Sequence, residues 1–321
     1  MLKVGLPDNV DHDLHRLLPE GIALELLPLQ PAQPVEVEFW IAPPWSGQAQ
    51  RQLPFLRGLR VIQSALAGVD QLLKIKPPDV MLCDARGVHN ISTAEWTVAA
   101  VLASTKYFPL FGKIQQAGVW SRRKEAEDLY HTLHPGSKRN YPPILCDELH
   151  GKQVLIVGYG AIGQAIENRL QPFGVSFVRV ARTARESIHS VKELRELLPS
   201  ADIVILIVPF TSETTGMIGE RELALMKHGA VLVNAARGPV VDTEAMLTAL
   251  HAGRIIAAVD VTDPEPLPDR HPLWTAPNLL ITPHVAASTP MFMVRAIQFA
   301  GAQIARYMHG EPLENVVMGE Y

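Results

Sequence analysis

The chain has 321 residues, of which 47% are hydrophobic and 19% charged, and its formal net charge is -4 at pH 7. This length suits two domains that each bury a core, and the charge gives no reason to expect nucleic acid or an anionic membrane surface as a partner. The longest apolar runs, such as residues 203–208, are too short to span a bilayer, and residues 1–6 have no signal-peptide profile. We therefore expect a cytoplasmic protein that does not bind a membrane. Cys83 and Cys146 match neither a disulfide framework nor a metal-ligand spacing, so no metal site is expected.

Short strands alternate with Pro-rich loops and short helical pieces over the first 90 residues or so. The expected strands are residues 2–6, 22–26, 37–41, 60–63 and 80–83. This alternation predicts a small unit built on a parallel sheet. After the fourth strand, the small residues of 65–70 would expose backbone amides able to hold a carboxylate, although an ordinary strand-to-helix turn explains them equally well.

A helix is expected next. Polar residues at 90–95 offer capping groups for an apolar helical run at 96–102, which is expected to continue toward Phe108 and to be interrupted by Pro109. A long helix that leaves a small unit is a natural crossing point to a second domain.

The stretch 121–149 is polar and rich in charged residues, His and Pro, and it shows no strong periodicity. A connection of this size is usually either functional or mobile, and the sequence leaves both interpretations open. His131 and His134 lack the carboxylate or cysteine pattern of a metal site.

An apolar run at 154–157 opens directly into the turn Gly158-Tyr159-Gly160-Ala161-Ile162-Gly163. The run is typical of a buried parallel strand, and residues 164–170 are typical of the helix that follows it. Gly158 would allow the tight turn, Gly160 the approach of a pyrophosphate, and Gly163 the close packing of helix on strand. The sequence therefore predicts a dinucleotide-binding turn.

From this turn onward, strands and helices alternate regularly. The expected strands, at 154–157, 175–180, 203–208, 230–234, 255–259 and 279–281, make a doubly wound dinucleotide-binding domain. Residues 289–308 form a long amphipathic helix that can return to the first unit. We therefore predict an α/β protein of two Rossmann-like domains, one flavodoxin-like and one dinucleotide-binding, with parallel sheets and a cleft between them. The substrate domain would comprise residues 1–92 with 287–321, and the dinucleotide domain residues 93–286.

The end of the second strand of this domain favours NADP as cofactor. NAD-binding units place an acidic residue there, about 20 residues past the glycines, to bind the ribose hydroxyls. Here the strand runs into Arg182, Thr183 and Arg185, and no carboxylate follows until Glu186. Arg182, helped by Thr183 and with Arg185 as a further candidate, could pair with a 2′-phosphate. A solvated surface turn is the alternative, and NAD then remains open.

Three later stretches each place one reactive residue after a strand end: Arg237 within 233–239, Glu265 within 260–266 and His284 within 281–289. Hydride transfer to a 2-keto acid needs these residue types. An Arg can bind the carboxylate, a His can give or take the proton on oxygen, and a Glu can orient that His. Each residue alone has an ordinary explanation, as a surface ion pair, a loop charge or a core histidine. Their joint position behind a dinucleotide turn favours catalysis.

The sequence resembles the D-isomer-specific 2-hydroxyacid dehydrogenases over nearly its whole length. The resemblance rests on the order of six motifs, at 65–70, 158–163, 208–216, 234–241, 260–266 and 283–289. It implies that Arg237, Glu265 and His284 are catalytic and that Arg237 and His284 also bind the substrate. It further implies a carboxylate cradle at Ala67 and Gly68, a nicotinamide contact at Asp260 and, along the cofactor, Gly158 to Gly163, Val208, Pro209, Thr214, Ala235 and Ala236.

The family fold places the active site between two Rossmann-like domains, usually in a homodimer. This chain has Ala286-Ala287 where the family often has Gly-Gly, and its stretch 121–149 looks longer than usual. With its last residue at Tyr321, we expect it to lack the extra domain of longer phosphoglycerate dehydrogenases. A short glyoxylate or hydroxypyruvate reductase is the closer comparison.

We therefore expect an NAD(P)-dependent reductase of a small 2-keto acid. An NAD-linked oxidation of a D-2-hydroxy acid, as in phosphoglycerate dehydrogenase, is one alternative. A dinucleotide-sensing protein similar to the corepressors that resemble this family is another, but the intact Arg, Glu and His argue for an enzyme. The substrate itself stays open, because the sequence does not show which of Leu66, Trp120, Trp274 or the stretch 121–149 line the pocket.

Overall fold

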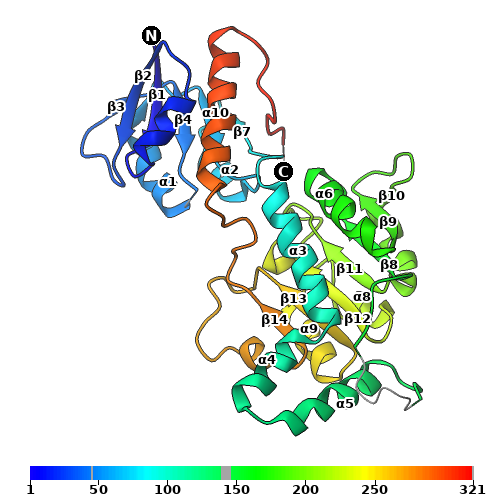
Figure 1. Cartoon of the computed structure of the whole chain (residues 1–321). Helices are drawn as coiled ribbons and strands as arrows, with labels where there is room; N and C mark the ends of the chain where they lie inside the picture. The colour runs from blue at the N-terminus through cyan, green and yellow to red at the C-terminus, as the bar shows by residue number, and fades with distance from the viewer. Residues whose placement is uncertain (45, 139–145, 320–321) are drawn as a thin grey trace. The chain divides into compact units, whose positions relative to one another are not determined.

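The computed structural model describes residues 1–44, 46–138 and 146–319, which form two compact units (Figure 1). The first unit is Met1–Asn90 with Ser288–Tyr321, and the second is Ile91–Ala287. The boundaries expected from the sequence lie two residues away at the first crossing and one residue away at the second. The α/β class and the parallel sheets are confirmed. The cleft expected between the domains stays a prediction.

The first unit is built on a five-stranded parallel sheet in the order β2-β1-β4-β6-β7. These five strands correspond to the five expected from the sequence. The strands β3 (Val35–Glu36) and β5 (Leu56–Arg57) pair separately and were not expected. The bounds of the main strands are β1 (Leu2–Pro7), β2 (Ile22–Leu27), β4 (Phe39–Ala42), β6 (Val61–Ser64) and β7 (Met81–Cys83).

Helices cover both faces of this sheet because its strands alternate buried side chains between two cores. Phe39 and Ile41 pack with Ile297 and Ile304 of α10 (Phe292–Met308). Trp40 belongs to the core on the other face. The remaining helices of the unit are α1 (Ser46–Gln52), α2 (Asp70–Ile75), and the 3-10 turns η1 (His12–Leu17) and η2 (Leu53–Phe55).

Helix α10 is the C-terminal helix expected at 289–308, and it begins at Phe292. It lies beside the strands of the first unit in Figure 1. A Cβ atom on Gly301 would overlap the carbonyl oxygen of Leu17 in η1. The glycine therefore allows the helix to lie against η1, and the first unit is discontinuous in sequence.

The second unit contains a seven-stranded parallel sheet in the order β10-β9-β8-β11-β12-β13-β14. Six of these strands were expected, and the seventh is the two-residue edge strand β10. Their bounds are β8 (Gln153–Val157), β9 (Ser176–Ala181), β10 (His189–Ser190), β11 (Ile203–Leu206), β12 (Ala230–Asn234), β13 (Ile255–Val259) and β14 (Leu279–Ile281).

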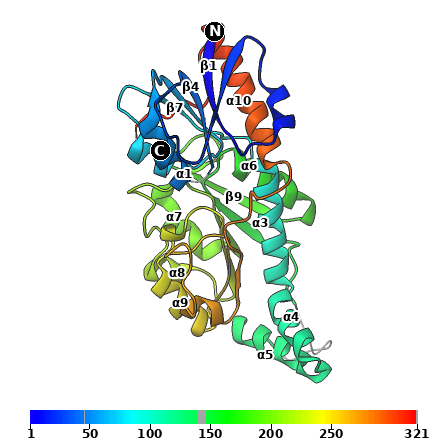
Figure 2. The same cartoon turned by 90° about the vertical axis from the view of Figure 1, so that its left-hand side faces the viewer.

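Two hydrophobic cores lie on the two faces of this sheet. Leu155 and Val157 join the core with α8 and α9, whereas Val154 and Ile156 join the core with α3, α5 and α6. Figure 2 shows α8 and α9 on one side of the sheet and α3 on the other. The α-helices are α3 (Asn90–Thr105), α4 (Phe108–Ala117), α5 (Lys124–Leu133), α6 (Ala161–Leu170), α7 (Leu194–Leu197), α8 (Glu220–Leu225) and α9 (Thr243–His251). The 3-10 turns are η3 (Trp120–Arg123), η4 (Gln171–Phe173), η5 (Val191–Glu193), η6 (Leu198–Ser200), η7 (Gly238–Val240) and η8 (Pro272–Thr275).

The structure corrects two expectations about the connection between the units. Helix α3 already ends at Thr105, Tyr107 takes a left-handed conformation at φ +54°, and Pro109 lies in the first turn of α4 instead of ending α3. Proline is well suited to a first helical turn because it lacks an N–H. The stretch 121–149, in which no strong periodicity was recognised, contains helix α5, which buries Ala126 and Leu133. Residues 139–145 of that stretch lie outside the described residues.

Among the residues that the structure describes, no helix is both long and apolar enough to cross a membrane. Both cysteines are free thiols. Cys83 lies in β7 of the first sheet and is buried, and this burial raises the pKa of its thiol to about 12.

Candidate active site

The glycine turn joins β8 to α6 at the centre of the second sheet. Gly158 has φ +105°, and a Cβ atom there would lie 2.5 Å from the carbonyl oxygen of Ile207. A Cβ atom on Gly163 would lie 2.9 Å from the carbonyl oxygen of Gly158. Both positions therefore require glycine for packing of the turn itself.

Gly160 has a different environment. It is the N-cap residue of α6, without a side-chain capping bond, and a Cβ atom there would meet no atom within 4 Å. The first-turn amides of α6, at Ala161, Ile162 and Gly163, belong to the group that has no partner inside a helix. Open space in front of these donors fits an anionic pyrophosphate.

A partly buried ion pair joins the helix after the turn to the neighbouring strand. Glu167 of α6 and Arg179 of β9 make two hydrogen bonds of 2.6 Å each. The hydrogen bonds from Arg179 hold the pKa of the Glu167 carboxyl below its ordinary value. The guanidinium of Arg179 also lies 5.6 Å from the ring centroid of Tyr159, so the turn, the helix and the second strand are tied together.

The loop after β9 carries the residues expected to select the cofactor. Arg182 Nε lies 3.1 Å from Glu213 Oε2, and both side chains are more than half exposed, at 55% and 64%. Thr183 is exposed beside it. Arg185 donates through Nη2 to the carbonyl oxygen of Tyr159 at 3.0 Å. The two arginines therefore have different partners.

Val208, Pro209 and Thr214, expected along the cofactor, follow β11. The hydroxyl of Thr214 donates to the carbonyl oxygen of Pro209 at 2.8 Å and accepts from the amide of Thr211 at 2.9 Å. Thr214 is buried, whereas Pro209 is exposed and Val208 half-buried. Thr214 therefore shapes the loop, and Pro209 forms part of its surface.

Arg237 follows β12 and lies in a tightly bonded corner. The side-chain amide of Asn234 donates to the carbonyl oxygen of Arg237 at 3.0 Å and accepts from the amide of Ala236 at 3.0 Å. Ala236 is buried and Ala235 half-buried. A Cβ atom on Gly238 would overlap the carbonyl oxygen of Thr262, so glycine allows the loop of Arg237 to touch the loop that leads to Glu265.

Glu265 and His284 are in direct contact, although they come from different loops. Glu265 Oε1 lies 2.5 Å from His284 Nδ1, and the two side chains are 37% and 50% exposed. His284 has φ +53°, a conformation that non-glycine residues rarely adopt. Its amide donates to the carbonyl oxygen of Asp260 at 2.7 Å. The pair has the geometry of a histidine oriented by a carboxylate.

Asp260 anchors the loop that carries His284. It is almost fully buried, at 2% exposure, and its carboxylate accepts from the amides of Val285 and Ala286 at 2.8 Å each. The hydroxyl of Thr282 donates to it at 2.5 Å and accepts from the indole of Trp96 at 3.0 Å. These bonds run within the second unit; the nicotinamide contact that the resemblance implies for Asp260 stays a prediction.

The predicted residues of the second unit share one edge of its sheet. The glycine turn, Arg182, Val208, Arg237, Asp260 and His284 each follow the carboxyl end of a strand, and all strands are parallel. Ligands bind at this edge in open α/β sheets. Ala67 and Gly68 follow β6 in the first unit and are half-buried.

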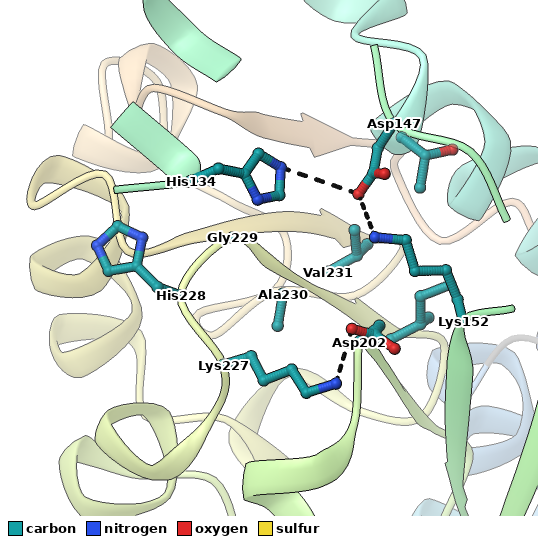
Figure 3. Close-up of a pocket in the computed structure, with 11 residues that line it drawn as sticks. His134, Asp147, Lys152, Asp202, Lys227, His228, Gly229, Ala230 and Val231 are labelled. Atoms are coloured by element: carbon teal, nitrogen blue, oxygen red, sulfur yellow. Dashed lines mark hydrogen bonds and ion pairs between the residues drawn. The ribbon is translucent and has the colours of Figure 1, made fainter. Parts of the chain in front are cut away.

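A cavity of about 190 Å³ lies at the opposite edge of the same sheet (Figure 3). Lys152 and Asp202, which line it, directly precede β8 and β11. Lys152 pairs with Asp147 at 2.7 Å and Lys227 with Asp202 at 2.8 Å. His134 points toward Asp147, and burial lowers the pKa of its imidazole. The cavity therefore does not belong to the predicted active site. Across the described ranges, no group of three or more His, Cys, Asp or Glu could hold a metal ion.

The chain is similar in sequence to a known family of dehydrogenases. Residues 98–286 match the domain described as "D-isomer specific 2-hydroxyacid dehydrogenase, NAD binding domain". A glyoxylate reductase from Thermofilum pendens is 34% identical over 262 residues, 79% of this chain and 73% of that protein. A D-3-phosphoglycerate dehydrogenase from Methanocaldococcus jannaschii is 33% identical over 268 residues, 81% of this chain but 47% of that protein, so this chain spans about half its length.

A solved structure agrees with these sequence matches. The crystal structure of a D-isomer specific 2-hydroxyacid dehydrogenase from Xanthobacter autotrophicus Py2, in complex with NADPH and MES, shares 27% identity at a TM-score of 0.77, over 98% of each chain. This chain belongs to the D-isomer specific 2-hydroxyacid dehydrogenase family. It is an NAD(P)-dependent oxidoreductase, as the sequence resemblance predicted.

Sequence reasoning missed four residues that shape this edge: Trp96, Glu213, Gly238 and Thr282. Thr282 directly follows β14, two positions before His284, and Gly238 directly follows Arg237. The sequence feature that could have pointed to Thr282 and Gly238 is therefore their position next to a predicted catalytic residue. Glu213 likewise directly precedes Thr214 in the motif at 208–216, whereas Trp96 comes from a distant segment of the chain, which the sequence does not show.

Proposed function

We propose that this protein is an NADPH-dependent reductase of a small 2-keto acid such as glyoxylate or hydroxypyruvate. The contact between Glu265 and His284 carries the proposal. It orients the imidazole of His284, a proton donor, at the edge of the sheet where a dinucleotide binds in this type of fold. The glyoxylate reductase of Thermofilum pendens supports the substrate class. A reduced nicotinamide dinucleotide held at the glycine turn would supply the hydride for C2 of the keto acid.

In this proposal His284 acts as general acid. Its Nδ1 atom faces Glu265, which leaves Nε2 to protonate the substrate oxygen as C2 is reduced. The Glu265 carboxylate stabilises the charged imidazole and fixes the orientation of the ring. In the reverse direction the same atom takes the proton from the hydroxyl group.

Arg237 binds the substrate carboxylate and polarises the keto oxygen, because a guanidinium offers paired donors to planar anions. The hydrogen bonds of the Asn234 side chain to the backbone of Ala236 and Arg237 hold the loop that carries Arg237. The contribution of the amides of Ala67 and Gly68 to carboxylate binding, the homodimer and the cytoplasmic location stay predictions of the sequence.

Oxidation of NADPH by glyoxylate, hydroxypyruvate and a panel of other 2-keto acids tests the proposal. We expect turnover with at least one small keto acid and a loss of about a thousandfold in kcat for His284→Ala. No turnover across the panel, or undiminished turnover in His284→Ala, refutes it. Size-exclusion chromatography with light scattering tests the dimer.

An NAD-linked oxidation of a D-2-hydroxy acid is the second candidate, supported by the phosphoglycerate dehydrogenase of Methanocaldococcus jannaschii. NADP is favoured because Arg182 and Thr183 follow the second strand where NAD-binding units have an acidic residue. Titration of the protein with NADPH and NADH separates the two. If the protein is an NADPH-dependent reductase, Arg182→Ala should raise the Kd for NADPH and leave the Kd for NADH nearly unchanged. If it is NAD-linked, Arg182→Ala should change neither Kd.

A further inference from the structure

The ion pair between Arg182 and Glu213 spans the entrance to the glycine turn. Arg182 follows β9 and Glu213 lies in the loop after β11, and these two strands flank β8 on either side. The glycine turn leaves the carboxyl end of β8. The pair therefore connects two loops across the strand end where the adenosine half of a dinucleotide binds in this type of sheet.

The Glu213 carboxylate already pairs with the guanidinium of Arg182, the group that would bind the 2′-phosphate of NADP. Its Oε2 atom lies 3.1 Å from Nε of Arg182. Arg185, the other arginine of the loop, donates instead to the carbonyl oxygen of Tyr159. A phosphate that binds Arg182 must therefore compete with the Glu213 carboxylate or bind beside it.

The exposure of the pair decides how strong this competition is. With 55% and 64% of the two side chains exposed, the ion pair is of the kind that opens at little cost. The displaced carboxylate nevertheless stays on its loop and repels a dianionic phosphate, whereas it has no such effect on the uncharged 2′-hydroxyl of NAD. The effect is thus selective by charge.

We propose that Glu213 is a cofactor-discriminating residue that competes with the 2′-phosphate of NADP for Arg182 and so lowers the preference for NADP over NAD. This inference rests on the proposed role of Arg182. Glu213 is assigned to cofactor selection and not to the chemistry of hydride transfer.

Glu213→Gln tests the inference by equilibrium titration of the full chain. We expect the Kd for NADPH to fall about fivefold, the upper end of the range for a solvent-exposed charge pair, and the Kd for NADH to change less than twofold. The fragments 2′,5′-ADP and 5′-AMP, titrated by calorimetry, should show the same contrast without turnover. In an Arg182→Ala background, Glu213→Gln should tighten the binding of 2′,5′-ADP by a smaller factor than in the parent, because the competition for Arg182 is then absent and only the repulsion between the Glu213 carboxylate and the phosphate remains.

Glu186→Gln is the matched control, because Glu186 is an exposed carboxylate on the same loop as Arg182. It should leave both Kd values within twofold of the parent. The inference is overturned if Glu186→Gln has the same effect as Glu213→Gln. It is also overturned if Glu213→Gln tightens the binding of NADPH and NADH equally, weakens the binding of NADPH or changes neither Kd. If Arg182→Ala does not raise the Kd for NADPH, the proposed cofactor site itself is wrong. If Arg182→Ala raises this Kd and Glu213→Gln has no effect on it, only the role of Glu213 is wrong.

Discussion

The Nδ1 atom of His284 lies 2.5 Å from Oε1 of Glu265. Because the carboxylate takes this nitrogen, Nε2 is the ring atom left to exchange a proton with a substrate. Glu265→Gln keeps the size of the side chain but removes the negative charge that stabilises an imidazolium. We expect kcat to fall about a hundredfold or more, with little change in the Kd for NADPH. Steady-state kinetics and cofactor titration measure the two quantities.

Glu244→Gln is the matched control for this change, because Glu244 is an exposed carboxylate in the first turn of α9. Its kcat should equal that of the parent. A kcat of Glu265→Gln within threefold of the parent contradicts the assigned role of the pair.

Thr282 links Trp96 to Asp260 and so helps to position the loop of His284. Thr282→Val removes the hydroxyl, which leaves the indole of Trp96 without this acceptor and the buried carboxylate of Asp260 without one donor. The free energy of unfolding should fall by about 1–3 kcal/mol, and kcat should fall more than KM changes. Thermal unfolding and kinetics measure both. Thr282→Ser, which restores the hydroxyl, should recover kcat; failure to do so argues against positioning through this bond.

Much of the fold follows from local sequence. The strands β8, β11, β12 and β13 are apolar runs bounded by glycine or polar residues, and such runs predict buried parallel strands. The edge strand β10 has two residues, too few to show a pattern. Helix α5 was missed because its sequence is dominated by charged and polar residues, although it buries Ala126 and Leu133. Its apolar residues Ala126, Leu129, Tyr130 and Leu133 nevertheless recur at helical spacing and pack in one core of the second unit.

The candidate site divides in the same way. Arg237, Glu265 and His284 could be predicted because each follows a strand end at a known edge of the sheet. The contacts that hold them could not, because they join residues far apart in the sequence. Trp96 and Thr282 are one case, and the approach of Gly238 to Thr262 is another.

Gly238 sets the spacing between the loops of Arg237 and Glu265. In Gly238→Ala the new methyl group would overlap the backbone of Thr262, so one of the two loops must move. Overpacking of this kind costs about 1–3 kcal/mol of stability, and we expect KM for the keto acid to rise because Arg237 moves with its loop. Gly112→Ala, at a helical position with no atom within 4 Å of the new Cβ, is the control. Equal KM values for the two variants contradict the prediction.

The ion pair between Glu167 and Arg179 makes stability depend on pH. Since Arg179 lowers the pKa of Glu167 in the folded state, its contribution is present above the unfolded pKa and is lost as pH falls through the folded pKa. Glu167→Gln should lower the free energy of unfolding by about 1–3 kcal/mol at pH 7. The difference between parent and variant should shrink below about pH 4. Urea unfolding at several pH values measures it, and a difference that stays constant with pH contradicts the assignment.

Gly158 and Gly160 separate the packing of the turn from its binding role. A Cβ atom on Gly158 would lie 2.5 Å from the carbonyl oxygen of Ile207 at φ +105°, whereas one on Gly160 would enter open space. Gly158→Ala should therefore lower the melting temperature, because alanine strains this backbone. Gly160→Ala should leave the melting temperature unchanged and raise the Kd for NADPH at least tenfold, because its methyl group occupies the space in front of the first turn of α6 where a pyrophosphate binds. Thermal unfolding without cofactor and titration with NADPH give the two readouts. A Gly160→Ala protein that binds NADPH like the parent would place the pyrophosphate elsewhere.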